Sequence, residues 1–137
     1  MGRTVVKLVE GMKFLAQGKS THPVMMDSVP AFGGSDSAAR PMEVLLASLG
    51  GCTGMDVVSI LRKMKTEPKS LKIEIEDERA TEHPKILTKL HLRYYVTGEV
   101  SEANLKKAID LSLTKYCPVA NGLAGIAEIT SSYVIEP

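Results

Sequence analysis

The sequence of 137 residues is short of several features that would indicate a function class. Its two cysteines are too few for the disulfide framework of a secreted domain, and in a reducing compartment such a pair favours redox or catalytic chemistry. The formal net charge is +1, and no basic block or basic-aromatic stripe indicates nucleic acid or an anionic membrane as a partner. No apolar run is long enough to span a bilayer, and the N-terminus lacks a signal-peptide layout. We therefore expect a cytoplasmic protein.

Apolar residues make up 44% of the chain, enough for a hydrophobic core, and their periodicity predicts an α+β fold with mostly antiparallel strands. We expect one domain over residues 1–137, because too little chain precedes the Gly/Ser-rich stretch at 27–40 to form a domain alone. The predicted elements are strands at 3–9, 13–17 and 22–26, a long helix from Pro41, a hairpin of strands at 71–77 and 86–96, a helix from Ser101 to about Tyr116, and a closing strand at 128–135.

The long helix has an unusual composition around Cys52. Residues 44–58 are apolar or small on nearly every face, with Asp56 as the only charge, which is typical of a helix buried on all sides. Glycines at 50, 51 and 54 surround the cysteine, although each glycine inside a helix costs about 1 kcal/mol relative to alanine. Two interpretations stay open. The glycines allow close packing on a sheet or helix with Cys52 as a small buried side chain, or they allow close packing on a partner subunit with Cys52 facing a pocket.

The second cysteine, Cys117, lies in the segment YCPVANGL, where Pro118 keeps it out of a regular helix. If the two cysteines meet in space, they can act as attacking and resolving thiols. The two cysteines and three histidines do not show the close spacing of a zinc knuckle, so we expect neither a metal nor another bound cofactor.

Three segments together resemble the OsmC/Ohr family, the osmotically inducible and organic hydroperoxide resistance proteins. They are PMEVLLASLGGCTGMDVV at 41–58, EHPK at 82–85 and KYCPV at 115–119. The Gly-Gly-Cys-Thr form is closer to the OsmC-like branch. The resemblance implies an OsmC-like fold: N-terminal antiparallel strands, a long buried central helix, a β-hairpin, a second helix and a closing strand, assembled as an intertwined homodimer.

The resemblance also implies an activity. Two active sites at the subunit junctions would reduce organic hydroperoxides, with Cys52 as the peroxidatic thiol and Cys117 as the resolving one. A lipoyl-type dithiol or a small thiol would then reduce the resulting disulfide.

This sequence departs from the pattern of the peroxidase branch at two positions. That branch has a glutamate just after the helix-opening proline, whereas here the glutamate is one residue later, at Glu43. Glu43 lies nine residues before Cys52, which corresponds to about 900° of helical turn, so in a continuous helix it faces away from that cysteine. As a candidate catalytic residue it could help only from a non-helical start or across the dimer. The expected arginine of the N-terminal strands is replaced by Gln-Gly-Lys at 17–19. Because a buried thiolate needs a nearby cation, the candidates are Lys19, Arg40 and Arg3, in that order.

Two functions from different classes follow. The first is a thiol-dependent peroxidase, which the presence of both cysteines favours. The second is a non-enzymatic dimeric binding module for a small apolar or thiol-bearing ligand, which the missing arginine and displaced glutamate favour.

Overall fold

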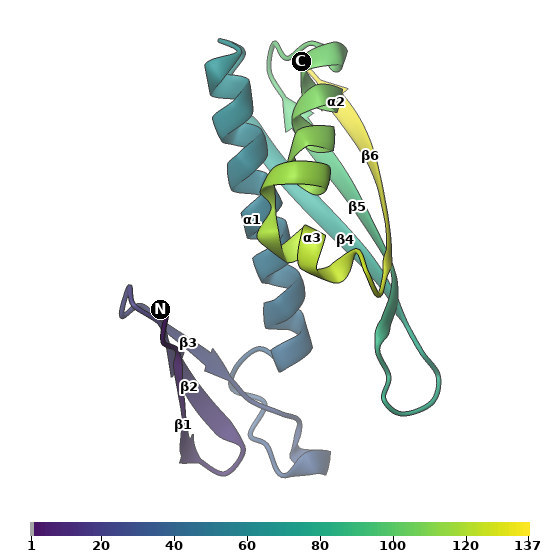
Figure 1. The fold of residues 1–137 in the computed structure, drawn as a ribbon. Coiled ribbons are helices and arrows are strands. Elements are labelled where there is room, and N and C mark those ends of the chain that lie inside the picture. Colours follow the sequence, from purple (N-terminus) through teal and green to yellow (C-terminus); the bar gives the residue numbers. More distant parts are fainter. Residues whose placement is uncertain (1) are drawn as a thin grey trace. The chain divides into compact units, whose positions relative to one another are not determined.

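The computed structural model describes residues 2–137, which form an N-terminal unit that ends at Ala47 and a C-terminal unit, Ser48–Pro137 (Figure 1). The long helix α1 (Pro41–Lys63) begins in the first unit and continues into the second. The prediction of a long helix that opens at Pro41 is confirmed, and that of a single domain over 1–137 stays a prediction.

The N-terminal unit contains a three-stranded antiparallel sheet in the order β1-β2-β3, and its strands lie close to the three predicted at 3–9, 13–17 and 22–26. Its strands are β1 (Val5–Glu10), β2 (Lys13–Gln17) and β3 (Pro23–Met26), and a short 3₁₀ helix, η1 (Pro30–Phe32), follows. The hairpin turn between β1 and β2 holds Gly11 at a φ of +55°, a conformation that glycine adopts without strain. Every residue of β1 is exposed, so this sheet has no covered face along its first strand.

The loop that leads into α1 is organised around the buried carboxylate of Asp27. Its oxygens accept hydrogen bonds from the amides of Ser28 (2.7 Å), Ser35 (3.2 Å) and Ser37 (3.1 Å), and from the Ser37 hydroxyl (2.7 Å). These hydrogen bonds lower the pKa of Asp27 to about 2, and the bond from the Ser37 hydroxyl has the largest effect. Gly34 is required here, since a Cβ would lie 1.9 Å from the Ser28 carbonyl oxygen. A charged side chain thus fixes the loop.

The C-terminal unit contains a second sheet, in the order β4-β5-β6. Its strands are β4 (Ser70–Arg79), β5 (Leu87–Thr97) and β6 (Glu128–Glu136). β4 and β5 form the predicted antiparallel hairpin, whereas β6 runs parallel to β5. Parallel neighbours need a long crossover connection, and the segment between β5 and β6 supplies it with helices.

That crossover differs from the single predicted helix over 101–116. Ser101 caps α2 (Glu102–Leu111) as expected, with its hydroxyl accepting from the Asn104 amide at 3.1 Å. The last predicted turn, η2 (Ser112–Tyr116), is a π-helix, and a further short helix, α3 (Pro118–Leu123), follows it. Proline suits the first position of α3 because its missing N–H has no partner there in any case.

The hydrophobic core lies between the second sheet and the helices that cover one of its faces, α1, α2 and α3 (Figure 1). Gly50 and Gly54 bring α1 close to β4, since a Cβ on either would lie 3.3 Å from an isoleucine methyl of that strand. Among residues 2–137, the buried hydrophobic side chains are Leu49, Val57, Leu61, Leu87, Leu90, Leu92, Tyr94, Val96, Val100, Leu105, Ala108, Ile109, Cys117, Ala120 and Ala127.

The residues buried at the start of β5 differ from those that the alternation of the sequence predicts. Strict alternation places Ile86 and Thr88 on the buried face, yet Leu87 is the buried residue and Ile86 is exposed. The register between β4 and β5 shifts beside Arg79, which pairs with Leu87. Such a bulge inserts one residue into a strand, so the alternation changes face there.

Helix α1 is also long and apolar enough to cross a membrane by length and composition, so the expectation that no segment reaches that length was wrong. The estimate failed because small residues extend the apolar stretch without forming an unbroken run of large ones. Only 22% of its most apolar window is buried within the chain.

Candidate active site

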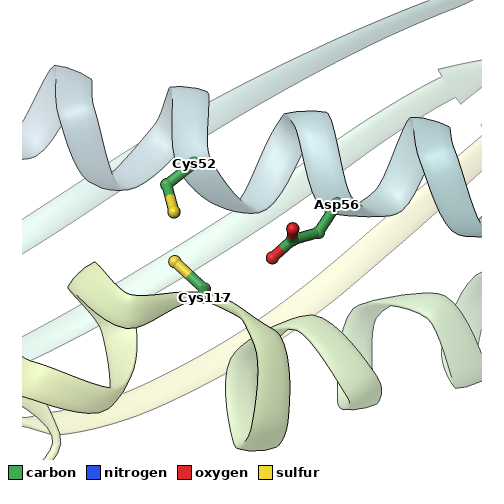
Figure 2. Close-up of side chains that lie close together, drawn as sticks. All are labelled: Cys52, Asp56 and Cys117. Atoms are coloured by element: carbon green, nitrogen blue, oxygen red, sulfur yellow. The ribbon is translucent and has the colours of Figure 1, made fainter.

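Two cysteines that lie 65 positions apart in the sequence meet between α1 and the segment before α3 (Figure 2). Cys52 extends from α1 toward Cys117, and Asp56 lies one helical turn further along the same face of α1. The two sulfurs and a carboxylate oxygen of Asp56 all lie within 4.8 Å of one another. The expectation that the cysteines come close in space is therefore met by the geometry.

The two thiols have different surroundings. Cys52 is half-buried on a regular helix. Beside it, a Cβ added at Gly51 would have no other atom of the chain within 4 Å beyond the adjoining helix backbone. Cys117 is fully buried in extended backbone, where it caps α3: its sulfur accepts from the Ala120 amide at 3.3 Å. Its own amide donates to the Ser112 carbonyl at 2.8 Å, which ties Cys117 to the π-helical turn. Single π turns of this kind are frequent at functional sites.

Burial raises the pKa of the Cys117 thiol to about 11. The amide of Ala120 acts in the opposite direction, and the adjacent Cys52 thiol adds to the increase. Cys117 is thus a neutral thiol at physiological pH, which suits a residue that reacts second better than one that attacks first.

Asp56 ends a chain of buried hydroxyl groups. Ser112 donates to Asp56 Oδ2 at 2.9 Å, and Thr53 Oγ1 lies 2.7 Å from both the Ser112 hydroxyl and the Tyr94 hydroxyl. A hydroxyl has one proton to donate, and that of Ser112 goes to the carboxylate. Ser112 must then accept from Thr53, and Thr53 from Tyr94. Burial raises the pKa of Tyr94 to about 12, so its proton stays in place at the start of this chain.

Residues 34–132 match the family model described as OsmC-like protein. The chain belongs to this family. It is 39% identical over 131 residues to Protein YhfA of Escherichia coli K12, an alignment that covers 95% of each protein. It is also similar to the solved structure of a hypothetical protein from Aquifex aeolicus, with 29% identity, a TM-score of 0.83 and coverage of 100% of this chain and 98% of that one.

A more distant solved structure, an organic hydroperoxide resistance protein OsmC from Legionella pneumophila, has the same fold. It is 18% identical, covers 96% of each chain and gives a TM-score of 0.67. The OsmC-like fold predicted from the three sequence motifs is confirmed.

The other predicted site residues of this OsmC-like protein, Lys19, Arg40 and Glu43, belong to the N-terminal unit. Arg40 forms an ion pair with Asp36 and donates to the Ala38 carbonyl at 2.8 Å. Glu43 accepts from the Arg40 amide at 2.9 Å, the contact of a helix-capping box. Lys19 is exposed. Arg40 and Glu43 thus have structural partners at the start of α1, and the catalytic roles of all three stay predictions.

Sequence reasoning missed Asp56 and Ser112 as members of the site. The signal for Asp56 was present, because it is the only charge in the apolar stretch 44–58 and lies four residues after Cys52. Its negative charge disfavours a neighbouring thiolate, so the sequence alone did not favour it as a site residue. Ser112 gave no signal, since it joins the site through the π turn at the end of α2.

Proposed function

We propose that this protein is a thiol-dependent peroxidase that reduces organic hydroperoxides with Cys52 and Cys117. The observation that carries the proposal is the approach of the two sulfurs to within 4.8 Å, with one thiol half-buried and the other fully buried. The half-buried thiol can meet a substrate, and the buried one can meet only its partner thiol. Membership of a family that includes hydroperoxide resistance proteins supports the same chemistry.

The proposed reaction has three steps. The Cys52 sulfur attacks the outer peroxide oxygen, the O–O bond breaks, and the alcohol leaves with the displaced proton, so that Cys52 becomes a sulfenic acid. The Cys117 sulfur then attacks the Cys52 sulfur, a disulfide forms and water leaves. A dithiol of the lipoyl type, or two small thiols, finally reduces the disulfide and is itself oxidised.

Asp56 has a defined place in the second step. Cys117 carries a proton at neutral pH, because its pKa is about 11, and that proton must leave as its sulfur attacks. The carboxylate of Asp56 is the adjacent acceptor, and the Ser112 hydroxyl fixes its orientation. We assign the attacking role to Cys52, the resolving role to Cys117 and the role of proton acceptor to Asp56.

The proposal includes a homodimer. Exposed apolar side chains are numerous in the N-terminal unit, and Phe32 and Met55 are 75% and 76% exposed. Only Leu49, Thr53, Val57 and Leu61 of α1 are fully buried within one chain, although the helix is strongly apolar. A second copy that covers these surfaces would place Cys52 near a subunit junction. Sedimentation equilibrium at micromolar concentration should give a dimer, and a stable monomer would contradict this part of the proposal.

Two free thiols that must be reduced after each turnover need a reducing compartment, so the proposal also places the protein in the cytoplasm.

The binding-module alternative is favoured by one observation. Arg40 is paired with Asp36, and Glu43 caps the helix at the Arg40 amide, so both groups have partners other than a thiol. An OsmC-like protein without an activated cysteine would bind a small apolar or thiol-bearing ligand and leave it unchanged.

Stopped-flow mixing of the reduced protein with an alkyl hydroperoxide, followed by thiol counting, separates the two functions. The peroxidase loses both thiols for one peroxide consumed, and it reacts faster with the alkyl hydroperoxide than with hydrogen peroxide. The Cys52→Ser variant should consume no peroxide above the rate of a free thiol. Retention of both thiols in the wild-type protein would support the binding module.

A further inference from the structure

The cluster of Cys52, Cys117 and Asp56 combines two sulfur atoms and a carboxylate in a small volume. The three ligand atoms lie within 4.8 Å of one another. In a tetrahedral zinc site, with Zn–S bonds of about 2.3 Å and Zn–O bonds of about 2.0–2.2 Å, neighbouring ligand atoms are about 3.5–3.8 Å apart. A movement of about 1 Å, within the range of side-chain rotation on Cys52, would therefore give bonding distances to one ion.

The surroundings of Asp56 are those of a metal-ligating carboxylate. Ser112 donates to Asp56 Oδ2 at 2.9 Å, and a carboxylate offers further lone pairs that can bind an ion. Ser112 and Thr53 are fully buried, and they join Asp56 to Tyr94 through 2.7 Å contacts. Such outer contacts orient a ligand before the ion arrives, and their loss typically weakens metal affinity about 10- to 100-fold.

We propose that the reduced protein binds one thiophilic divalent cation of the zinc class through the sulfurs of Cys52 and Cys117 and one carboxylate oxygen of Asp56. A water molecule would complete the tetrahedron at the side where Cys52 is accessible. Sulfur ligands select zinc-class ions over magnesium or calcium. Binding releases the protons of the two thiols to solvent and involves no oxidation, and the cation balances negative charges that would otherwise repel one another in a buried site.

The inference shares its two cysteines with the proposed function but does not depend on peroxidase activity. If both hold, a bound cation and a peroxide compete for the same sulfurs, so zinc protects both thiols from an alkyl hydroperoxide. Disulfide formation removes two ligands and releases the ion.

Cobalt(II) is the probe, because sulfur-to-cobalt charge-transfer bands report thiolate ligands without any assay of activity. Titration of the reduced wild-type protein should saturate at one equivalent per chain with bands of two thiolates, and added zinc should displace the cobalt. Cys52→Ser and Cys117→Ser should each halve the band intensity. Asp56→Asn and Ser112→Ala should keep the bands but weaken the affinity about tenfold or more.

Asp110→Asn is the matched control, since Asp110 is an exposed carboxylate on α2 of the same unit. It should bind cobalt as the wild type does, and circular dichroism should show the same helix content in all variants. Absence of charge-transfer bands in the fully reduced protein would overturn the site. An affinity unchanged in Asp56→Asn would overturn the three-ligand assignment. Cobalt binding is measured without peroxide. The metal site can therefore be confirmed or rejected whether or not the protein proves to be a peroxidase.

Discussion

The two units of the chain are stabilised in opposite ways. Among residues 2–137, every buried hydrophobic side chain lies between Leu49 and Ala127, in the C-terminal unit. In the N-terminal unit the buried side chain is the carboxylate of Asp27, while β1 exposes its valines and Leu8. A small sheet whose first strand is fully exposed buries little apolar surface, and such a sheet is marginal in water. The comparison indicates that the C-terminal unit supplies its own core, whereas the N-terminal unit has a charged loop anchor and exposed apolar side chains that the proposed dimer would cover.

Matched leucine truncations should show the largest difference between the units. Leu92→Ala leaves a cavity in the C-terminal core and should lower the free energy of unfolding by about 2–5 kcal/mol. Leu8 is 51% exposed in one chain, so Leu8→Ala should destabilise the protein only by weakening the proposed dimer. Urea unfolding at several protein concentrations tests this: the effect of Leu8→Ala should depend on concentration. The comparison would be wrong if Leu8→Ala lowered the free energy of unfolding as much as Leu92→Ala does, and by an amount independent of protein concentration.

The units should also respond to opposite extremes of pH. The pKa of Asp27 is lowered from 3.8 to about 2, so its stabilising contribution is present above pH 3.8 and is lost as pH falls through 2. The pKa values of Cys117 and Tyr94 are raised from 9.0 to about 11 and from 10.0 to about 12. Their contributions are present below those ordinary values and are lost as pH rises through the raised ones.

Urea unfolding as a function of pH measures both effects. At acid pH, the slope of the free energy of unfolding against pH reports how many protons the chain takes up on unfolding. Asp27→Asn should lower this number by up to one and should leave the slope at alkaline pH unchanged. Cys117→Ser should reduce the slope between about pH 9 and 11 only. Asp110→Asn is the control for the loss of an exposed carboxylate. An acid slope that survives in Asp27→Asn would show that this carboxylate does not anchor the N-terminal unit.

The glycines of α1 should give the smallest effects. Alanine is better than glycine inside a helix by about 1 kcal/mol. A Cβ at Gly51 meets nothing within 4 Å of its own chain, so Gly51→Ala should realise much of that gain wherever the partner of the proposed dimer leaves this position open. Gly50→Ala should gain less, since its Cβ would lie 3.3 Å from the Ile75 methyl. Thermal unfolding of the two variants separates them. Equal gains would mean that Gly50 is not needed for the approach of α1 to β4.

Local pattern in the sequence was enough for most of the fold. Period-2 alternation located β4 and β5, Pro41 marked the start of α1, and Ser101 marked that of α2. Strand direction is not encoded locally, so the parallel pairing of β6 followed only from the crossover. Helix α3 was missed because its Asn-Gly pair has the composition of a loop, while the cap by Cys117 decides its start.

The sequence predicted the two cysteines of the candidate site, but it did not predict Asp56 and Ser112 beside them. Three motifs in the right order predicted Cys52 and Cys117 as the reactive pair, which stays a prediction, and the separation of the two cysteines in the sequence gave no distance between their sulfurs. The partners of Asp56 depend on a π turn, which places Ser112 against α1 and has no sequence signature of its own. Helical spacing predicted that Glu43 faces away from the cysteine of its own chain, and its carboxylate caps the Arg40 amide, as its position three residues after Arg40 allows.

The central claim is that Cys52 reacts first and Cys117 resolves it, and intact-mass spectrometry tests it most directly. The reduced wild-type protein receives one equivalent of alkyl hydroperoxide and is then quenched with a thiol-alkylating reagent. We expect a loss of two hydrogens and no alkylation in the wild type, a gain of one oxygen or more in Cys117→Ser, and no change other than alkylation in Cys52→Ser. Oxidation of Cys52→Ser at Cys117, or an unoxidised wild-type protein, would contradict it.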